Sequence, residues 1–196
     1  SASSVRITGS AYECGQSQTG SGFAVAGDRV VTNAHVVAGV EAPQVESFDG
    51  QLFTGQVVAF DPDIDVAIIA LPGAQLPIVE FGEVLEPGDP AFVLGFPSGG
   101  PHQILAAEIQ AHGPATVANI YDENAQLRDV YQLAAKVRQG NSGGALVGED
   151  GTVAGVIFAR ASEADIGYAM SHAEIAEMVN QAPHLSQPVS TGHCLE

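Results

Sequence analysis

Ser142 lies in the stretch Gly140-Asn141-Ser142-Gly143-Gly144 and is the best candidate for a nucleophile in this chain. A serine hydroxyl attacks a carbonyl poorly at its free pKa, so it needs an adjacent base. The attack creates an oxyanion, which backbone N–H groups must face in order to stabilise it. Glycine tolerates backbone angles that other residues avoid, so this turn could aim its N–H groups into a site. Alone, the pattern is also an ordinary turn.

The base for this serine would be one of six histidines. His35 ends an apolar strand that begins at Val30, where it could equally be a buried structural histidine. The other five histidines lie in loop-like or helix-start surroundings, namely His102, His112, His172, His184 and His193. No histidine pairs with a second one at a metal-ligand spacing, so we expect no metal and no cofactor.

An acid to orient the base is offered by Asp61, Asp63 and Asp65, which alternate just before the apolar run 66–71. In an extended segment all three carboxylates would face one side. Most such clusters are solvated loops, but an acid directly before a buried strand can be held in the interior beside a histidine. The chain order His, Asp, Ser is that of the chymotrypsin-type triad and differs from the subtilisin and α/β-hydrolase orders.

With these residues in place, the sequence resembles the trypsin-like serine proteases of the bacterial HtrA-related kind. The matching segments occur in the family's order over residues 20–170: Gly20-Ser21-Gly22-Phe23, Thr32-Asn33-Ala34-His35-Val36-Val37, Asp65-Val66-Ala67-Ile68, Gly95-Phe96-Pro97, Gly140-Asn141-Ser142-Gly143-Gly144-Ala145-Leu146 and Gly167-Tyr168-Ala169. More narrowly, residues 30–39 and the cysteines near the two ends are similar to the protease domain of the actinobacterial acid-resistance periplasmic proteases of the MarP type.

The resemblance implies an acyl-enzyme mechanism in which His35 takes the proton of Ser142 while Asp65 orients the imidazole. It selects Asp65 over Asp63, because the family's acid is followed by Val-Ala. The N–H groups of Gly140 and Ser142 would form the oxyanion hole. The implied fold is all-β, a chymotrypsin-like double six-stranded β-barrel with a C-terminal helix, in which the first barrel supplies His35 and Asp65 and the second supplies Ser142.

Within this resemblance, three residues concern activation and specificity. Trypsin-like zymogens carry an Asp directly before the nucleophile, which pairs with a newly freed N-terminal ammonium. Asn141 cannot form that ion pair, so we predict activation without a new N-terminus. Lys136 and Arg160 stand where the resemblance puts the floor and the lining strand of the specificity pocket, and they would favour acidic or polar residues near the cut. The alternative is that both are surface charges balancing an acidic protein.

The elements that must position these residues are short strands joined by tight turns, because Gly (23) and Pro (11) are plentiful and valines recur in short runs. Turns are predicted at Gly27-Asp28, Asp49-Gly50 and Asp150-Gly151. One helix is predicted from the capping box Ser171-His172-Ala173-Glu174, with Pro183 ending it.

We therefore expect three parts. Residues 1–80 would hold the N-terminal segment and the first barrel, 81–182 the second barrel and the helix, and 183–196 a tail tied back by a disulfide. That disulfide would join Cys14 to Cys194 and indicate an oxidising compartment; two free thiols, or a redox sensor that gates the protease, are the alternatives.

The net charge of −17 argues against nucleic acid or an anionic membrane as a partner. No apolar run approaches the ~20 residues of a spanning helix, so the chain as given is expected to be soluble and monomeric. By resemblance, an absent N-terminal transmembrane region would anchor the parent protein outside the cytoplasm.

The function expected is a serine endopeptidase that cuts protein or peptide substrates and is linked to stress or acid resistance. The alternative is a catalytically silent trypsin-like binding or scaffold module. Activity far below the ordinary His pKa would require a strongly depressed pKa of His35, since a protonated imidazole cannot act as a base.

Overall fold

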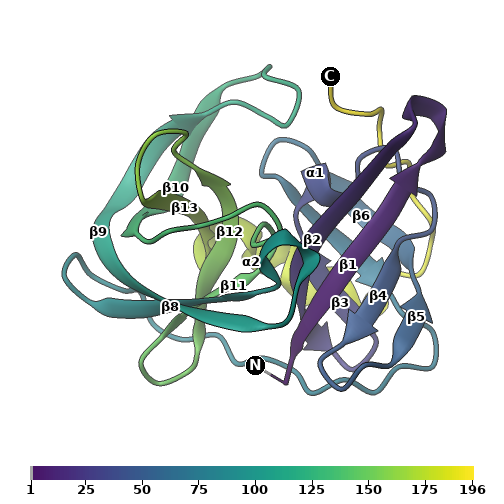
Figure 1. Cartoon of the computed structure of the whole chain (residues 1–196), viewed down its shortest axis with the longest axis horizontal. Helices are drawn as coiled ribbons and strands as arrows, with labels where there is room; N and C mark the ends of the chain where they lie inside the picture. The colour runs from purple at the N-terminus through teal and green to yellow at the C-terminus, as the bar shows by residue number, and fades with distance from the viewer. Residues whose placement is uncertain (1) are drawn as a thin grey trace.

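Two antiparallel β-sheets, each built from a continuous part of the chain, make up most of the structure (Figure 1). The computed structural model describes residues 2–196. The first sheet has the strand order β5-β4-β1-β2-β3-β7-β6, and the second is a closed barrel with the order β10-β13-β12-β11-β8-β9. The predicted all-β architecture of two barrel-like sheets and a C-terminal helix is confirmed.

The first sheet curls so that its two end strands are consecutive in the chain. Its strands are β1 (Ser4–Ala11), β2 (Gln16–Ala26), β3 (Arg29–Thr32), β4 (Gln44–Ser47), β5 (Leu52–Thr54), β6 (Gln56–Asp61) and β7 (Val66–Ala70). Only Gly55 separates β5, which pairs with β4, from β6, which pairs with β7. A Cβ added at Gly55 would collide with Ile69, so this bend requires glycine. Counted as one bent strand, β5 and β6 make this a six-stranded sheet.

The second sheet is closed by a long strand that pairs with two neighbours in succession. Its strands are β8 (Pro90–Gly95), β9 (Gln103–Val117), β10 (Gln126–Ala134), β11 (Ala145–Gly148), β12 (Val153–Arg160) and β13 (Ile166–Ser171). The first part of β9 pairs with β8 and the rest with β10. The loop after β9 reaches back to the first sheet, where the Ile120 N–H donates to Pro62 O over 3.1 Å.

The helices are short, and the predicted C-terminal one is the longest. They are α1 (Ala34–Val37), α2 (His172–Gln181) and the 3-10 turns η1 (Tyr12–Cys14), η2 (Pro97–Gly99) and η3 (Ala182–His184). Within residues 2–196, no helix is long and apolar enough to span a membrane.

Helix α2 begins where the sequence predicts, but the predicted capping box is wrong. The Ser171 side chain makes no capping hydrogen bond. Glu174 turns to β10 instead, where Oε1 accepts the Asp129 N–H over 2.6 Å and Oε2 lies 3.6 Å from Arg128. The carboxylate is therefore used to attach the helix to the barrel rather than to cap it.

One apolar cluster joins the two sheets. It combines Phe23 and Ile68 of the first sheet with Val156 and Met170 of the second and Ile175 of α2. Separate clusters fill each barrel, around Ile7 in the first and Leu133 in the second. Side chains from both halves are therefore held against one another at the sheet boundary, where the candidate site lies.

Candidate active site

His35 and Asp65 are brought together by the pairing of β3 with β7. Thr32 is the register partner of Ala67, so the residues just after β3 lie beside those just before β7. His35 Nδ1 lies 2.6 Å from Asp65 Oδ2, and the His35 N–H donates to Asp65 Oδ1 over 2.9 Å. An ionised carboxylate only accepts, so Nδ1 carries the hydrogen and Nε2 keeps a lone pair. That is the tautomer a general base requires.

Asp65 is held in an unusual backbone conformation. Its φ is +55°, in the left-handed region that non-glycine residues seldom occupy. Its carbonyl accepts a hydrogen bond of 2.8 Å from Asn33 Nδ2, and Asn33 is itself fully buried. Such strained residues persist where their surroundings fix them, and they cluster at functional sites.

The three acidic residues of this loop point to different partners. Asp61 Oδ1 accepts the Asp63 N–H over 2.9 Å, and Asp63 Oδ1 accepts from Asn119 Nδ2 over 3.3 Å. Only Asp65 faces His35. The expectation that all three share one side is wrong, because residues 62–65 form a turn rather than an extended segment.

Each carbonyl group from Gln139 to Ser142 is held by a hydrogen bond. The donors are Ser98 N–H to Gln139 O (2.6 Å), Ser21 Oγ to Gly140 O (2.6 Å), Gly144 N–H to Asn141 O (2.9 Å) and Ser21 N–H to Ser142 O (2.8 Å). In a trans peptide the N–H points opposite to the preceding carbonyl. The N–H groups of Gly140 and Ser142 therefore point away from these donors, and neither has a hydrogen-bond partner within residues 2–196.

The turn around Ser142 packs directly on the first sheet. Gly143 has φ +87°, and a Cβ added there would collide with Ser21 O and Thr32 Oγ1. Gly20 lies between Ser142 and α1, since a Cβ there would be 3.2 Å from Ser142 O and 2.6 Å from Val36. The serine is thus held beside the helical turn that carries His35.

No hydrogen bond joins the Ser142 hydroxyl to His35 among the described residues. In ligand-free sites such bonds are often long and tighten only when substrate binds. Burial lowers the pKa of His35, but the negative charge and hydrogen bond of Asp65 raise it by more. The net pKa of His35 therefore lies above the ordinary histidine value, and its imidazolium is stabilised.

The other predicted residues make no side-chain hydrogen bond or ion pair to His35, Asp65 or Ser142 within residues 2–196. Lys136 and Arg160 are exposed and form no ion pair within residues 2–196. Asn141 is buried, and its Oδ1 accepts the Arg138 N–H over 3.1 Å, which ties its side chain into the turn. Within the described residues, no three His, Cys, Asp or Glu side chains form a metal-binding group.

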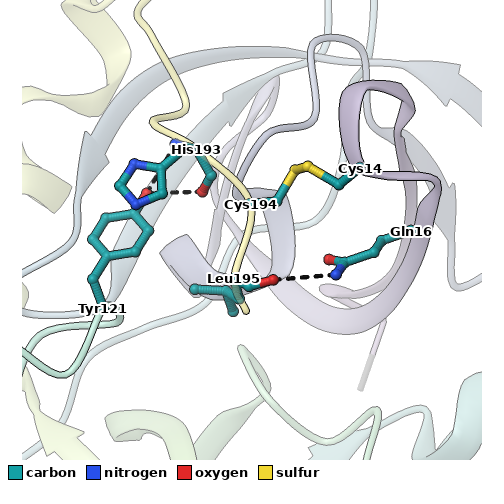
Figure 2. The surroundings of a disulfide bond; sticks show 6 residues. All are labelled: Cys14, Gln16, Tyr121, His193, Cys194 and Leu195. Atoms are coloured by element: carbon teal, nitrogen blue, oxygen red, sulfur yellow. Dashed lines mark hydrogen bonds between the residues drawn. A yellow bond between two sulfur atoms is a disulfide. The ribbon is translucent and has the colours of Figure 1, made fainter.

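Cys14 and Cys194 form a disulfide, so the alternative of two free thiols is excluded (Figure 2). Next to the disulfide, the His193 ring stacks on Tyr121 at a centroid distance of 4.0 Å. The Tyr121 hydroxyl donates to His193 O over 3.0 Å and accepts the His193 N–H over 3.1 Å (Figure 2). The tail is therefore tied to the first sheet by the disulfide and to the loop after β9 by Tyr121.

Sequence reasoning missed the two serines that hold the turn, Ser21 and Ser98. Both lie in or next to segments that carry the resemblance, Gly20-Ser21-Gly22-Phe23 and Gly95-Phe96-Pro97. Their contacts with Gly140 and Gln139 join residues far apart in the sequence, so only the glycines of those segments hinted at close backbone packing.

Comparison with known proteins places this geometry in a family. Residues 20–156 match the model of the trypsin-like peptidase domain. The serine protease Rv3671c of Mycobacterium tuberculosis is 38% identical over 194 residues, which are 97% of this chain and 48% of that protein. A Chlamydia trachomatis protein named "Probable periplasmic serine endoprotease DegP-like" is 37% identical over 140 residues, which are 70% of this chain and 27% of that protein. The chain spans about half, or less, of the length of these curated relatives.

Solved structures show the same fold. The crystal structure of the active form of Rv3671c protease from M. tuberculosis superimposes with a TM-score of 0.95 at 37% identity, covering 100% of this chain and 86% of that one. The inactive form gives a TM-score of 0.80 at 36% identity, with 92% and 89% covered. The HtrA-type protease AlgW with a tripeptide gives 0.82 at 26% identity, with 92% and 60% covered.

Proposed function

Since the chain belongs to the trypsin-like peptidase family, we propose that it is a serine endopeptidase with Ser142 as nucleophile, His35 as base and Asp65 as the orienting acid. The observation that carries the proposal is the His35–Asp65 pair, 2.6 Å apart, beside a turn in which the N–H groups of Gly140 and Ser142 have no hydrogen-bond partner among residues 2–196. The higher TM-score with the active than with the inactive form of the mycobacterial protease supports an assembled site.

The mechanism follows from where each group lies. His35 Nε2 removes the Ser142 proton as Oγ attacks the substrate carbonyl, and Asp65 stabilises the resulting imidazolium. The N–H groups of Gly140 and Ser142 bind the oxyanion as it forms. The imidazolium then gives its proton to the leaving amine, and water attacks the acyl-enzyme with His35 again as base. Asp65 remains ionised throughout and holds His35 by the two hydrogen bonds already described, one from the ring Nδ1 and one from the backbone N–H.

Protein or peptide chains are the proposed substrates, in keeping with the AlgW structure that holds a tripeptide. We keep Lys136 and Arg160 as proposed specificity residues, since both cations are exposed and free of ion pairs in the described part of the chain. A peptide-library cleavage profile should lose its preference for acidic or polar residues near the cut in Lys136→Ala and Arg160→Ala. An unchanged profile would leave both residues as surface charges only.

An extracytoplasmic location is also a proposal, supported by the Cys14–Cys194 disulfide and by the periplasmic name of a relative. Anchoring of the parent protein by a transmembrane region, and a role in stress or acid resistance, rest on the resemblance to the MarP type. The raised pKa of His35 opposes catalysis in acid, because the protonated ring cannot accept the Ser142 proton.

Labelling with a fluorophosphonate probe tests the proposed function. Wild-type protein should be labelled at Ser142 and should cleave a denatured protein substrate, and Ser142→Ala should do neither. The matched control is Ser186→Ala, an exposed serine in the tail, which should behave as wild type. A folded wild-type chain that reacts with no probe and cuts no substrate would instead be a silent binding module.

A further inference from the structure

The 3-10 turn η2 lies directly against the proposed oxyanion hole. Its central residue, Ser98, donates its N–H to Gln139 O over 2.6 Å. A Cβ added at Gly140 would lie 2.5 Å from Phe96 O and 2.6 Å from Ser98 N, so the two backbones are in contact. The peptide that carries the Gly140 N–H is therefore oriented by η2, since its carbonyl end is fixed there.

The central residue of this turn has a strained backbone. Ser98 has φ +55°, an unfavourable left-handed conformation for a residue other than glycine. Two hydrogen bonds within residues 96–100 support the turn, from the N–H of Gly99 to Phe96 O and from the N–H of Gly100 to Pro97 O, each 3.0 Å. A strained residue of this kind stays in place when surrounding contacts determine it.

Arg6 of β1 supplies such a contact from the other barrel. Its Nη1 donates to Gly99 O over 2.7 Å, and its Nη2 pairs with Glu46, the register partner of Arg6 on β4. A planar guanidinium that bonds in two directions loses little further freedom, so it acts as a rigid brace. The brace joins β1 and β4 to the last residue of η2.

We propose that Arg6 is a positioning residue for the oxyanion hole. Arg6 fixes Gly99, and Gly99 holds Ser98 in its strained conformation. Ser98 in turn fixes the Gln139–Gly140 peptide, so that the Gly140 N–H is aimed at the site. The inference rests on the proposed function, because it concerns the same turn. Without Arg6, η2 relaxes, Gln139 O loses its donor, and glycine at 140 permits the peptide to rotate.

Ser21 limits the size of the effect. Its Oγ donates to Gly140 O over 2.6 Å and accepts the Phe96 N–H over 2.9 Å, so a second clamp remains on the same turn. Removal of one oxyanion donor costs about 10²–10³-fold in kcat in related chemistry. With Ser21 intact, Arg6→Gln should misplace that donor only part of the time and lower kcat by about tenfold.

Kinetics of Arg6→Gln test the proposal. The expected result is the tenfold fall in kcat with KM within about twofold of wild type, and an equal loss of affinity for a peptide boronate, whose adduct with the serine fills the hole. Arg6→Lys should recover part of kcat. The control is Arg128→Gln, which removes a more buried ion pair, with Glu174, on the second barrel and should leave both constants unchanged.

Hydrogen exchange gives a readout that needs no activity. The Ser98 amide should exchange about tenfold or more faster in Arg6→Gln than in wild type, and at the wild-type rate in Arg128→Gln. Unchanged Ser98 exchange overturns the proposal, and so does an unchanged kcat despite faster exchange. A wild-type chain without peptidase activity refutes the proposed function, and Ser98 exchange still decides whether Arg6 fixes η2.

Discussion

Residues 2–196 contain two histidine–aspartate pairs of nearly equal length, and only one of them lies beside the candidate nucleophile. His35 Nδ1 is 2.6 Å from Asp65, and His112 Nε2 is 2.8 Å from Asp129. The aspartate binds opposite nitrogens in the two rings. In the neutral state His35 therefore presents Nε2, at the far end of the ring, whereas His112 presents Nδ1, next to its own backbone.

The surroundings of the two pairs differ as much as their tautomers. The His112 ring stacks on Tyr131 at 4.4 Å, and the Asp129 N–H is used to bind α2 through Glu174. The Asp65 carboxylate instead takes both the ring and the backbone N–H of His35. A short His–Asp contact is therefore no evidence of catalysis by itself, because the free nitrogen must face a space where a substrate proton can be.

The largest contrast is expected on removing each histidine. His35→Ala should lower kcat/KM by about 10⁵–10⁶-fold, since loss of the base disables the whole triad. His112→Ala should leave kcat/KM within about threefold, because its ring only supports β9 and β10. Steady-state cleavage of a peptide substrate measures both. A comparable loss in the two variants would mean that the pairs are not functionally distinct.

Replacement of each acid should give a smaller contrast of the same kind. Asp65→Asn should lower kcat by about 10⁴-fold, as an amide at that position favours the wrong tautomer. Asp129→Asn keeps the backbone bond to Glu174 and should cost about 1–2 kcal/mol of unfolding free energy, with little change in kcat. Denaturant melts and kinetics on the same samples separate the two effects. Full activity in Asp65→Asn would refute its assigned role.

The smallest contrast between the two histidine–aspartate pairs is expected in how activity and stability depend on pH. Because the pKa of His35 is raised, the acid limb of kcat/KM should lie above pH ~6.5, the ordinary histidine value. The charged His35–Asp65 pair contributes stability that is fully present below pH ~6.5 and is lost as pH rises through the raised pKa.

The contribution of Asp129 to stability depends on pH in the opposite direction to that of His35. Burial raises the pKa of its carboxyl, but its hydrogen-bond partners, His112 among them, lower it by more. Its contribution to stability is present above pH ~4 and is lost as pH falls through the lowered pKa. The melting temperatures of Asp129→Asn and of wild type should therefore become equal only in strong acid, as thermal melts at several pH values can measure. An acid limb of wild-type kcat/KM well below pH ~6.5 would contradict the direction given for His35.

The sequence predicts the elements better than the contacts between them. Turn residues place β2–β3, β4–β5 and β11–β12 correctly, since Gly and Asp act locally. The resemblance also gives the triad candidates, of which the structure brings His35 and Asp65 together and leaves the catalytic roles as a proposal. The predicted Glu174 cap is wrong because groups on another element, the Asp129 N–H and Arg128, bind the carboxylate. Arg6 is missed because its partner Gly99 is 93 residues away in the sequence. Every residue carries a backbone carbonyl, so the sequence does not indicate which one accepts the hydrogen bond.

The C-terminal tail affects whether molecules of this protein can associate through the edge of the first sheet. In its sheet, β6 pairs with β7 alone, and the Val189 N–H of the tail donates to Val57 O of β6 over 3.0 Å. Arg29 holds Leu185 O, the disulfide fixes Cys194, and the tail runs along the first sheet between these points (Figure 1). An unprotected edge strand is a template for pairing with a second chain. The tail thus covers part of the β6 edge of the first sheet, and we expect its removal to cause aggregation before it changes catalysis.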